Sequence, residues 1–317
     1  MIAVAGLFFR LGDYNATVDW CTRAIDRAAD SHKKELAHAH YMRSVAYSHL
    51  PGYNGVEDGS RALEVYEELN DLVGQTNVLN NLGYDAYYRG AWDEAVELWS
   101  RSVETGTKSG DIVRTASSIH NLGEIFLDQG HYEDVEERLR KALRIWQGAA
   151  FVVGTALAHA NLARLYTRTG HLEQAERNLD AARAGFTESG AEAYILEEII
   201  RRCEWLIYSQ RADEALQLAV STITANEGAE GTEVSRASLH RLAAYALAFA
   251  GDSAAACTHI DASLELARTA ESEYEIAQTL EAALRIEGAD PNREQSEEEL
   301  VLKLGIVARP WTPIRQD

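Results

Sequence analysis

The fold is decided by a tripeptide that recurs in the middle of the chain: Asn81-Leu82-Gly83, Asn121-Leu122-Gly123 and Asn161-Leu162-Ala163. The two intervals between them are equal, at forty positions each, and a glycine follows each tripeptide at the same distance, at Gly90, Gly130 and Gly170. A small residue also recurs along the whole chain, at Ala24, Ala62, Ser102, Ala142, Ala182, Thr222 and Ser263. Self-similarity at a fixed period of this length predicts a stack of structural repeats.

Each repeat unit is predicted to form two helices. Apolar residues recur at helical spacing from Ile119 to Phe126, and Gly130 is suited to end this first helix. A second apolar stripe follows from Tyr132 to Trp146. Strand patterns with Asn-Gly turns are absent from the sequence. Since a single helix pair cannot bury both of its faces, we expect an all-α fold of about seven stacked helix pairs plus a capping helix.

The repeat pattern also predicts how the chain is divided. We expect the helical array to cover residues 1–288, and residues 289–317 to form a short helix and an extended C-terminal tail. Gly12 lies too close to Met1 for a first helix of full length, so the first repeat is predicted to be truncated. Its apolar surface would then be exposed, or covered by a partner such as a second copy of the chain. The tail is expected to pack back on the array through Ile306 and Trp311.

Composition excludes several classes of protein. The chain has 317 residues with 30 Lys and Arg against 50 Asp and Glu, a net charge of −20, which disfavours binding to nucleic acid. Its 3 cysteines form no CxxC motif, so neither a disulfide framework nor a zinc site is predicted. No apolar run is long enough to span a membrane. We therefore expect a cytoplasmic protein without membrane or nucleic-acid partners.

The repeats resemble the tetratricopeptide repeat (TPR). The residues that carry the resemblance in one unit are Leu82-Gly83, Gly90, Ala95, Trp99 and Ser102, and residues of similar size stand at most of the equivalent positions in the next two units. The resemblance implies a right-handed α-α superhelix, a TPR-like solenoid. The period exceeds the usual length of about 34 residues, as it does in the repeats of kinesin light chains and of bacterial signalling proteins.

A closer resemblance rests on Asn121-Leu122-Gly123-Glu124-Ile125 and on the C-terminal Leu304-Gly305-Ile306 with spaced prolines. These segments are similar to the C-terminal TPR region of actinobacterial regulators that carry a class III adenylate or guanylate cyclase domain and an ATPase module. No Walker A sequence or cyclase motif occurs in this chain. The resemblance implies the sensing or partner-binding region of a bacterial signalling or transcriptional regulator.

Resemblance to repeats that clamp peptides implies that residues in and around the Leu-Gly segments line a concave groove. These candidates are Asn77, Asn80, Asn81, Tyr84, His120, Asn121, Glu124, Asn161, Arg164 and Arg168. An asparagine amide can bond a peptide backbone through both a donor and an acceptor, and an arginine can pair with a carboxylate. Alternatively, asparagines at a fixed repeat position bond the neighbouring helix and stabilise the stack.

Catalytic and metal-binding signals are weak. His38 and His40 are two residues apart, so a helix turns them to different faces and we expect solvated histidines rather than a metal chelate. We therefore predict a non-catalytic scaffold for protein or peptide partners, without cofactor or metal. The alternatives are a receptor that encloses a small ligand or signalling peptide within the superhelix and, less favoured by the sequence, an enzyme on a helical scaffold.

Overall fold

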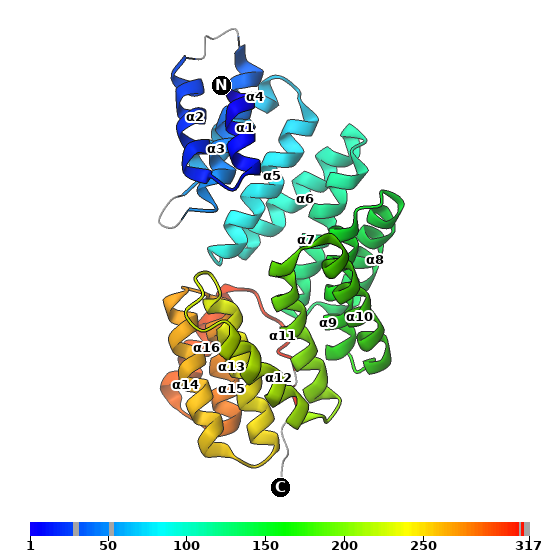
Figure 1. The fold of residues 1–317 in the computed structure, drawn as a ribbon, viewed down its shortest axis with the longest axis vertical. Coiled ribbons are helices and arrows are strands. Elements are labelled where there is room, and N and C mark those ends of the chain that lie inside the picture. The colour runs from blue at the N-terminus through cyan, green and yellow to red at the C-terminus, as the bar shows by residue number, and fades with distance from the viewer. Residues whose placement is uncertain (28–31, 51–53, 311, 314–317) are drawn as a thin grey trace. The chain divides into compact units, whose positions relative to one another are not determined.

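The computed structural model describes residues 1–27, 32–50, 54–310 and 312–313 (Figure 1). These residues form sixteen helices and no strand, so the predicted all-α solenoid of stacked helix pairs is confirmed. None of the described helices is long and apolar enough to cross a membrane. The chain divides into two compact units, Met1–Leu122 and Gly123–Asp317, and helix α7 runs through the boundary.

The first unit contains three antiparallel helix pairs and the beginning of a fourth. Its helices are α1 (Ile2–Arg10), α2 (Tyr14–Arg27), α3 (Lys33–Tyr47), α4 (Val56–Glu68), α5 (Leu72–Tyr88), α6 (Trp92–Ser109) and the first part of α7 (Ile112–Gln129). The short α1 leaves Leu7 49% and Leu11 69% exposed. The expected apolar surface at this end is therefore present.

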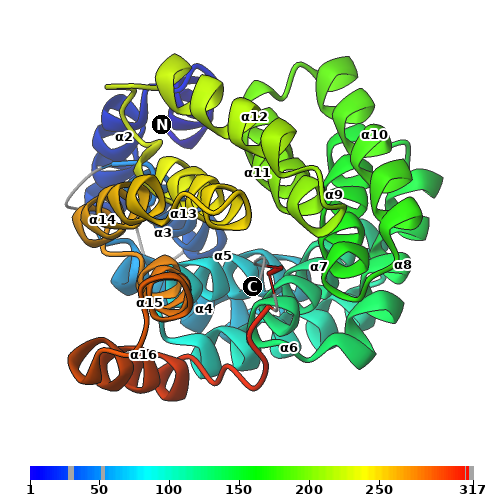
Figure 2. The same ribbon diagram turned by 90° about the horizontal axis from the view of Figure 1, so that it is seen from below.

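The second unit continues the same pattern. Its helices are the rest of α7, α8 (Tyr132–Gly148), α9 (Val152–Arg168), α10 (Leu172–Ser189), α11 (Glu192–Tyr208), α12 (Ala212–Ala225), α13 (Glu233–Phe249), α14 (Ser253–Thr269), α15 (Glu273–Glu287) and α16 (Pro291–Lys303). Figure 2 shows α9 and α11, each the first helix of its pair, on the inner side of α10 and α12. Along this inner row α9 contacts α11, α11 contacts α13, and α13 contacts α15.

Small residues allow the helices of a pair to approach closely. A Cβ atom on Gly83 would lie 2.4 Å from Trp99 Nε1, and one on Gly123 would lie 2.9 Å from Leu139 Cδ2. Both large side chains are buried, Trp99 at 2% exposure and Leu139 at 0%. The Leu-Gly positions of the repeat are therefore sites of helix packing, each filled by a large residue from the second helix of its pair.

Helix α16 lies within residues 289–317 and starts at Pro291. The Asp290 side chain accepts hydrogen bonds from the backbone N–H groups of Asn292 and Arg293 and so caps the helix. Proline is tolerated at the first helical position because its missing N–H would have no intrahelical partner there.

Candidate functional site

One face of α5 in the first unit presents asparagine and tyrosine to the surface. Asn77, Asn81, Tyr84 and Tyr88 follow one another at helical intervals of four, three and four positions, so they form a single stripe along the helix, here called the α5 stripe. Asn77 and Asn81 are half-buried and form no hydrogen bond with another described residue. Tyr84 and Tyr88 are 37% and 78% exposed. The stripe therefore combines available amides with accessible aromatic rings.

Asn80 and Asn121 instead connect α5 with α7. Asn80 Oδ1 accepts hydrogen bonds from Asn121 Nδ2 and from Ser118 Oγ, each at 3.0 Å. The Tyr84 hydroxyl donates to Asn121 Oδ1 at 2.9 Å. Asn121 is 1% exposed, and the neighbouring His120 is 4% exposed. These amides stabilise the stack, which was the alternative interpretation of the repeated asparagines.

In the second unit Asn161 and Glu124 both face Arg201 of α11. Arg201 Nη2 donates to Asn161 Oδ1 at 3.2 Å and lies 3.7 Å from Glu124 Oε1. Asn161 is 1% exposed, whereas the Glu124 side chain retains 28% exposure. The third asparagine of the repeat therefore also bonds neighbouring helices.

The two predicted arginines pair with carboxylates of the same chain. Arg164 forms an ion pair with Asp128 and donates to the Tyr274 hydroxyl at 3.2 Å. Arg168 Nε donates to Glu204 Oε1 at 2.9 Å, with both side chains at most 10% exposed. Burial alone would raise the pKa of Glu204, but the Arg168 and Arg164 guanidinium groups hold that pKa below its usual value. Glu204 is therefore ionised at neutral pH.

The C-terminal tail, meaning residues 305–310 and 312–313, crosses this unit as an extended segment (Figure 1). The backbone carbonyl of Gln129 accepts hydrogen bonds from the N–H groups of Val307 at 2.8 Å and Ala308 at 3.3 Å. Gln129 Nε2 in turn donates to the Leu304 carbonyl at 3.0 Å. Ile306 is 8% exposed, so the tail packs back on the repeats as predicted, whereas Trp311 lies outside the described residues.

Two arginines hold the outer part of the tail. Arg285 of α15 donates to the Thr312 carbonyl at 2.6 Å, and Thr312 is 3% exposed. Arg309 of the tail forms a two-point ion pair with Glu297 of α16, with Nη2 2.7 Å from Oε2. The tail is therefore attached at both ends, through its backbone at Gln129 and Arg285 and through one side chain at Glu297.

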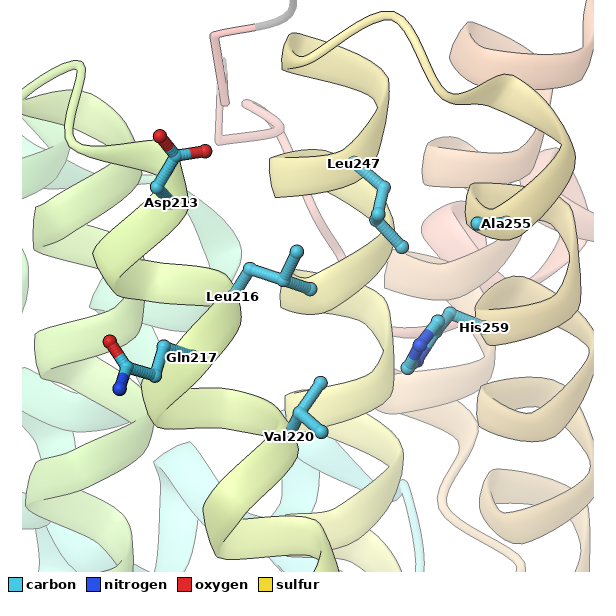
Figure 3. A pocket seen from close by; sticks show the side chains of 7 residues that line it. All are labelled: Asp213, Leu216, Gln217, Val220, Leu247, Ala255 and His259. Atoms are coloured by element: carbon cyan, nitrogen blue, oxygen red, sulfur yellow. The ribbon is translucent and has the colours of Figure 1, made fainter.

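A shallow pocket of about 500 Å³ lies between α12, α13 and α14 (Figure 3). Its lining residues are Asp213, Leu216, Gln217, Val220, Leu247, Ala255 and His259. His259 Nδ1 lies 2.9 Å from His240 Nδ1. Burial, with His259 and Arg236 nearby, lowers the pKa of His240 to about 4, so this ring is neutral at pH 7. The pocket contains none of the sequence-predicted site residues.

Histidine at the start of the chain is also structural. His40 Nδ1 lies 2.6 Å from Asp58 Oδ1, and Arg43 binds both oxygens of the same carboxylate. The prediction of a solvated histidine was therefore wrong for His40, because α4 brings Asp58 against α3. Among the described residues, no group of three or more His, Cys, Asp or Glu side chains is arranged to hold a metal ion.

Residues 74–148 and 115–188 match the tetratricopeptide repeat family. The match covers the central part of the chain, residues 74–188. The described chain is also similar to the structure of a Rap protein in complex with competence and sporulation factor, with a TM-score of 0.75 and 12% identity over 96% of this chain and 86% of that one. No curated protein sequence is significantly similar to this chain.

A second structure with a similar fold is the Rap conjugation gene regulator of the plasmid pLS20 in complex with the Phr* peptide. Its TM-score is 0.61 at 12% identity, over 95% of this chain and 84% of that one. At this level of identity, both comparisons show that the fold of the TPR segment extends over nearly the whole chain.

Proposed function

We propose that this TPR chain is a non-catalytic scaffold that binds a peptide or an extended segment of a partner protein, and that the α5 stripe contacts this partner. The observation that carries the proposal is the contrast within the asparagine set. Asn121 and Asn161 are buried and bonded to their own chain, whereas the amides of Asn77 and Asn81 are accessible and lack a partner among the described residues. Such amides can bond a peptide backbone.

The tyrosines of the stripe support the same function. Tyr84 packs edge-on against the buried Trp99, with ring centroids 5.6 Å apart, and Tyr88 packs against Tyr87 at 5.4 Å. Their exposed surfaces are therefore held in position by neighbouring rings. Rigid aromatic surface of this kind is enriched at the binding hot spots of protein interfaces. Glu124 adds an accessible carboxylate in the second unit, where the buried Asn161, Arg164 and Arg168 support the inner surface.

The two similar Rap structures support a peptide as the partner, because each contains a bound peptide or factor. We further infer that the chain is the sensing or partner-binding region of a bacterial signalling regulator. The resemblance to actinobacterial cyclase–ATPase regulators would make the effector a cyclase or ATPase module. Copurification of such a module with the full chain, from cells that express both, tests this assignment.

The proposal includes a homodimer formed through the end of the first unit. Leu7 and Leu11 lie one helical turn apart and expose apolar surface there. Pairing of this surface with that of a second copy would remove it from water. Light scattering of the full chain tests the assembly, and a monomer at micromolar concentration would contradict it.

Replacing both Asn77 and Asn81 with alanine is expected to weaken the binding of peptides selected on the wild-type chain from a random peptide library. Each neutral hydrogen bond contributes about 0.5–1.5 kcal/mol, so losing two weakens binding by about fivefold or more. Fluorescence anisotropy with a labelled selected peptide measures the dissociation constant. Far-UV circular dichroism should show an unchanged fold, because neither side chain is bonded within the described structure.

Asn15→Ala provides the matched control, since Asn15 is an exposed asparagine on α2 of the same unit. This variant should bind the selected peptides as tightly as the wild type. Equal binding by the wild type and the Asn77/Asn81 double variant would remove the α5 stripe from the proposed site.

A further inference from the structure

The second unit holds the C-terminal tail through backbone hydrogen bonds as well as through the buried side chains of Ile306, Pro310 and Thr312. Two backbone N–H groups, those of Val307 and Ala308, donate to the Gln129 carbonyl, and the Thr312 carbonyl accepts from Arg285. The Val307 residue is 64% exposed, so its side chain is not recognised by the surface beneath the tail. The backbone contacts are available to any extended peptide, because every non-proline residue supplies the same N–H and carbonyl groups.

The end of α7 explains why this surface accepts a peptide backbone. Gln129 is the last residue of α7, and carbonyls in the final turn of a helix lack an intrahelical partner. The next residue, Gly130, has φ +85°, and a Cβ atom placed on it would lie 2.4 Å from the Ala308 carbonyl oxygen. The absence of a side chain at residue 130 is therefore what lets the extended segment reach the exposed end of the helix.

Buried polar groups lie next to the outer part of the tail. Arg168 is close to the hydroxyls of Tyr132 and Tyr208, and Tyr208 interacts with the side chain of Thr312 of the tail. An extended peptide in the place of the tail would meet the same groups.

We propose that the tail is an exchangeable internal ligand, and that the surface beneath it binds an extended peptide that displaces the tail. The displacing peptide donates backbone N–H groups to the Gln129 carbonyl and accepts a hydrogen bond from Arg285. This inference adds a second peptide-binding surface to the proposed function and concerns the second unit alone. Its failure would leave the α5 stripe unaffected.

A proline at residue 307 is expected to open the tail while leaving the surface beneath it intact. The full chain with Val307→Pro loses the N–H that donates to Gln129, whereas Val307→Ala keeps it and changes only an exposed side chain. The probe is a labelled synthetic peptide with the sequence of residues 304–313. A tethered segment competes at an effective concentration of about millimolar, so the probe should bind the proline variant about tenfold or more tightly than the alanine variant.

A second pair of variants shows where the probe binds. In the Val307→Pro background, Gly130→Ala places a methyl group where the strand passes and should abolish probe binding. Gly170→Ala is the matched control, because Gly170 has φ +79° and no atom within 4 Å of an added Cβ. Both substitutions carry a similar backbone strain, so a difference between them reports contact with the strand.

Hydrogen exchange of the Val307 and Ala308 amides provides an independent readout. In the otherwise wild-type chain, Gly130→Ala should accelerate the exchange of residues 305–310, and Gly170→Ala should not. The proposal is overturned if the probe binds the proline and alanine variants equally, or if Gly130→Ala leaves binding unchanged. It is also overturned if the tail amides exchange at the same rate in both glycine variants.

Discussion

Replacing Glu275 with alanine is expected to destabilise the second unit by about 3–5 kcal/mol. Glu275 of α15 is paired with Arg241 of α13 at 2.6 Å and accepts a hydrogen bond from Ser238 at 2.8 Å, with both charged side chains at most 11% exposed. Burial alone would lower the pKa of Arg241, but the Glu275 carboxylate raises it above its usual value. Arg241 therefore stays charged, and the alanine variant leaves a buried cation without its partner.

Urea unfolding followed by circular dichroism measures this loss, and hydrogen exchange in α13 and α15 locates it. Glu214→Ala is the matched control, because Glu214 pairs with Arg211 at 2.6 Å while the two side chains remain 57% and 43% exposed. Such surface pairs contribute little to stability, so this variant should unfold like the wild type.

Replacing both residues of the pair by apolar residues shows why Glu275→Ala loses stability. The cause is either the missing attraction between Arg241 and Glu275 or the unpaired charge left on Arg241. Arg241→Met combined with Glu275→Leu should recover most of the stability lost in Glu275→Ala, because apolar residues of similar volume can replace a buried ion pair without large cost. A double variant as unstable as Glu275→Ala would show that the pair contributes specific attraction. A loss below about 1 kcal/mol in Glu275→Ala would contradict the assignment of a buried charge.

The helices could be predicted from the sequence because the signals that define them are local. The apolar stripe from Ile119 to Phe126 and the glycine at residue 130 predicted a first helix in this repeat, and α7 covers Ile112–Gln129. Similarly, the sequence predicted a capping helix after the last pair of an array that ends at residue 288, and α15 covers Glu273–Glu287. In both cases apolar spacing and a terminating glycine lie within the element or directly after it, so no knowledge of distant contacts was needed.

Whether each asparagine is buried and hydrogen-bonded could not be predicted, because its partner lies about one repeat away. Asn121 is buried because Asn80 and Tyr84 of the preceding repeat reach it, whereas Asn77 meets no such partner among the described residues. Arg201 was missed although it stands one full repeat after Asn161, at the same repeat position. In the sequence, the replacement of the repeated asparagine by an arginine at residue 201 was the signal that could have indicated a buried ion-pair network.

The contact between the tail and Gln129 could not be predicted from the sequence either. Ile306 was predicted to pack on the repeats, but Leu304 and Gln129 are 175 residues apart in sequence. Apart from the Gln129 side chain, the link joins a helix-terminal carbonyl to backbone N–H groups, and neither of these depends on residue type. Only Gly130 and Gly305 mark the close approach, since a Cβ on Gly305 would lie 3.0 Å from Gln129 Nε2.

Trp99→Ala is expected to destabilise the first unit by about 3–5 kcal/mol, the usual cost of removing a large buried aromatic side chain. Trp99 is 2% exposed, packs on Gly83, and its Nε1 donates to the Asn80 carbonyl at 3.1 Å. The substitution therefore leaves a cavity between α5 and α6 and removes the hydrogen bond to Asn80. Urea unfolding, with hydrogen exchange in α5 and α6, measures the loss.

Gly83→Ala tests the same contact from the opposite side. Its Cβ would lie 2.4 Å from Trp99 Nε1, so overpacking should cost about 1–3 kcal/mol despite the better helix propensity of alanine. At Gly148 of α8, where no atom lies within 4 Å of the added Cβ, alanine should be neutral or slightly stabilising.

The double variant decides whether these two residues act as one packing unit. When Trp99 is already replaced by alanine, the methyl group introduced at residue 83 enters the cavity, so the combined loss should fall below the sum of the separate losses by about 1 kcal/mol or more. Additive losses would mean that Gly83 and Trp99 do not act as one packing unit. That result would also remove close packing as the reason for glycine at the Leu-Gly positions, since Gly123 and Leu139 form the equivalent contact in the second unit.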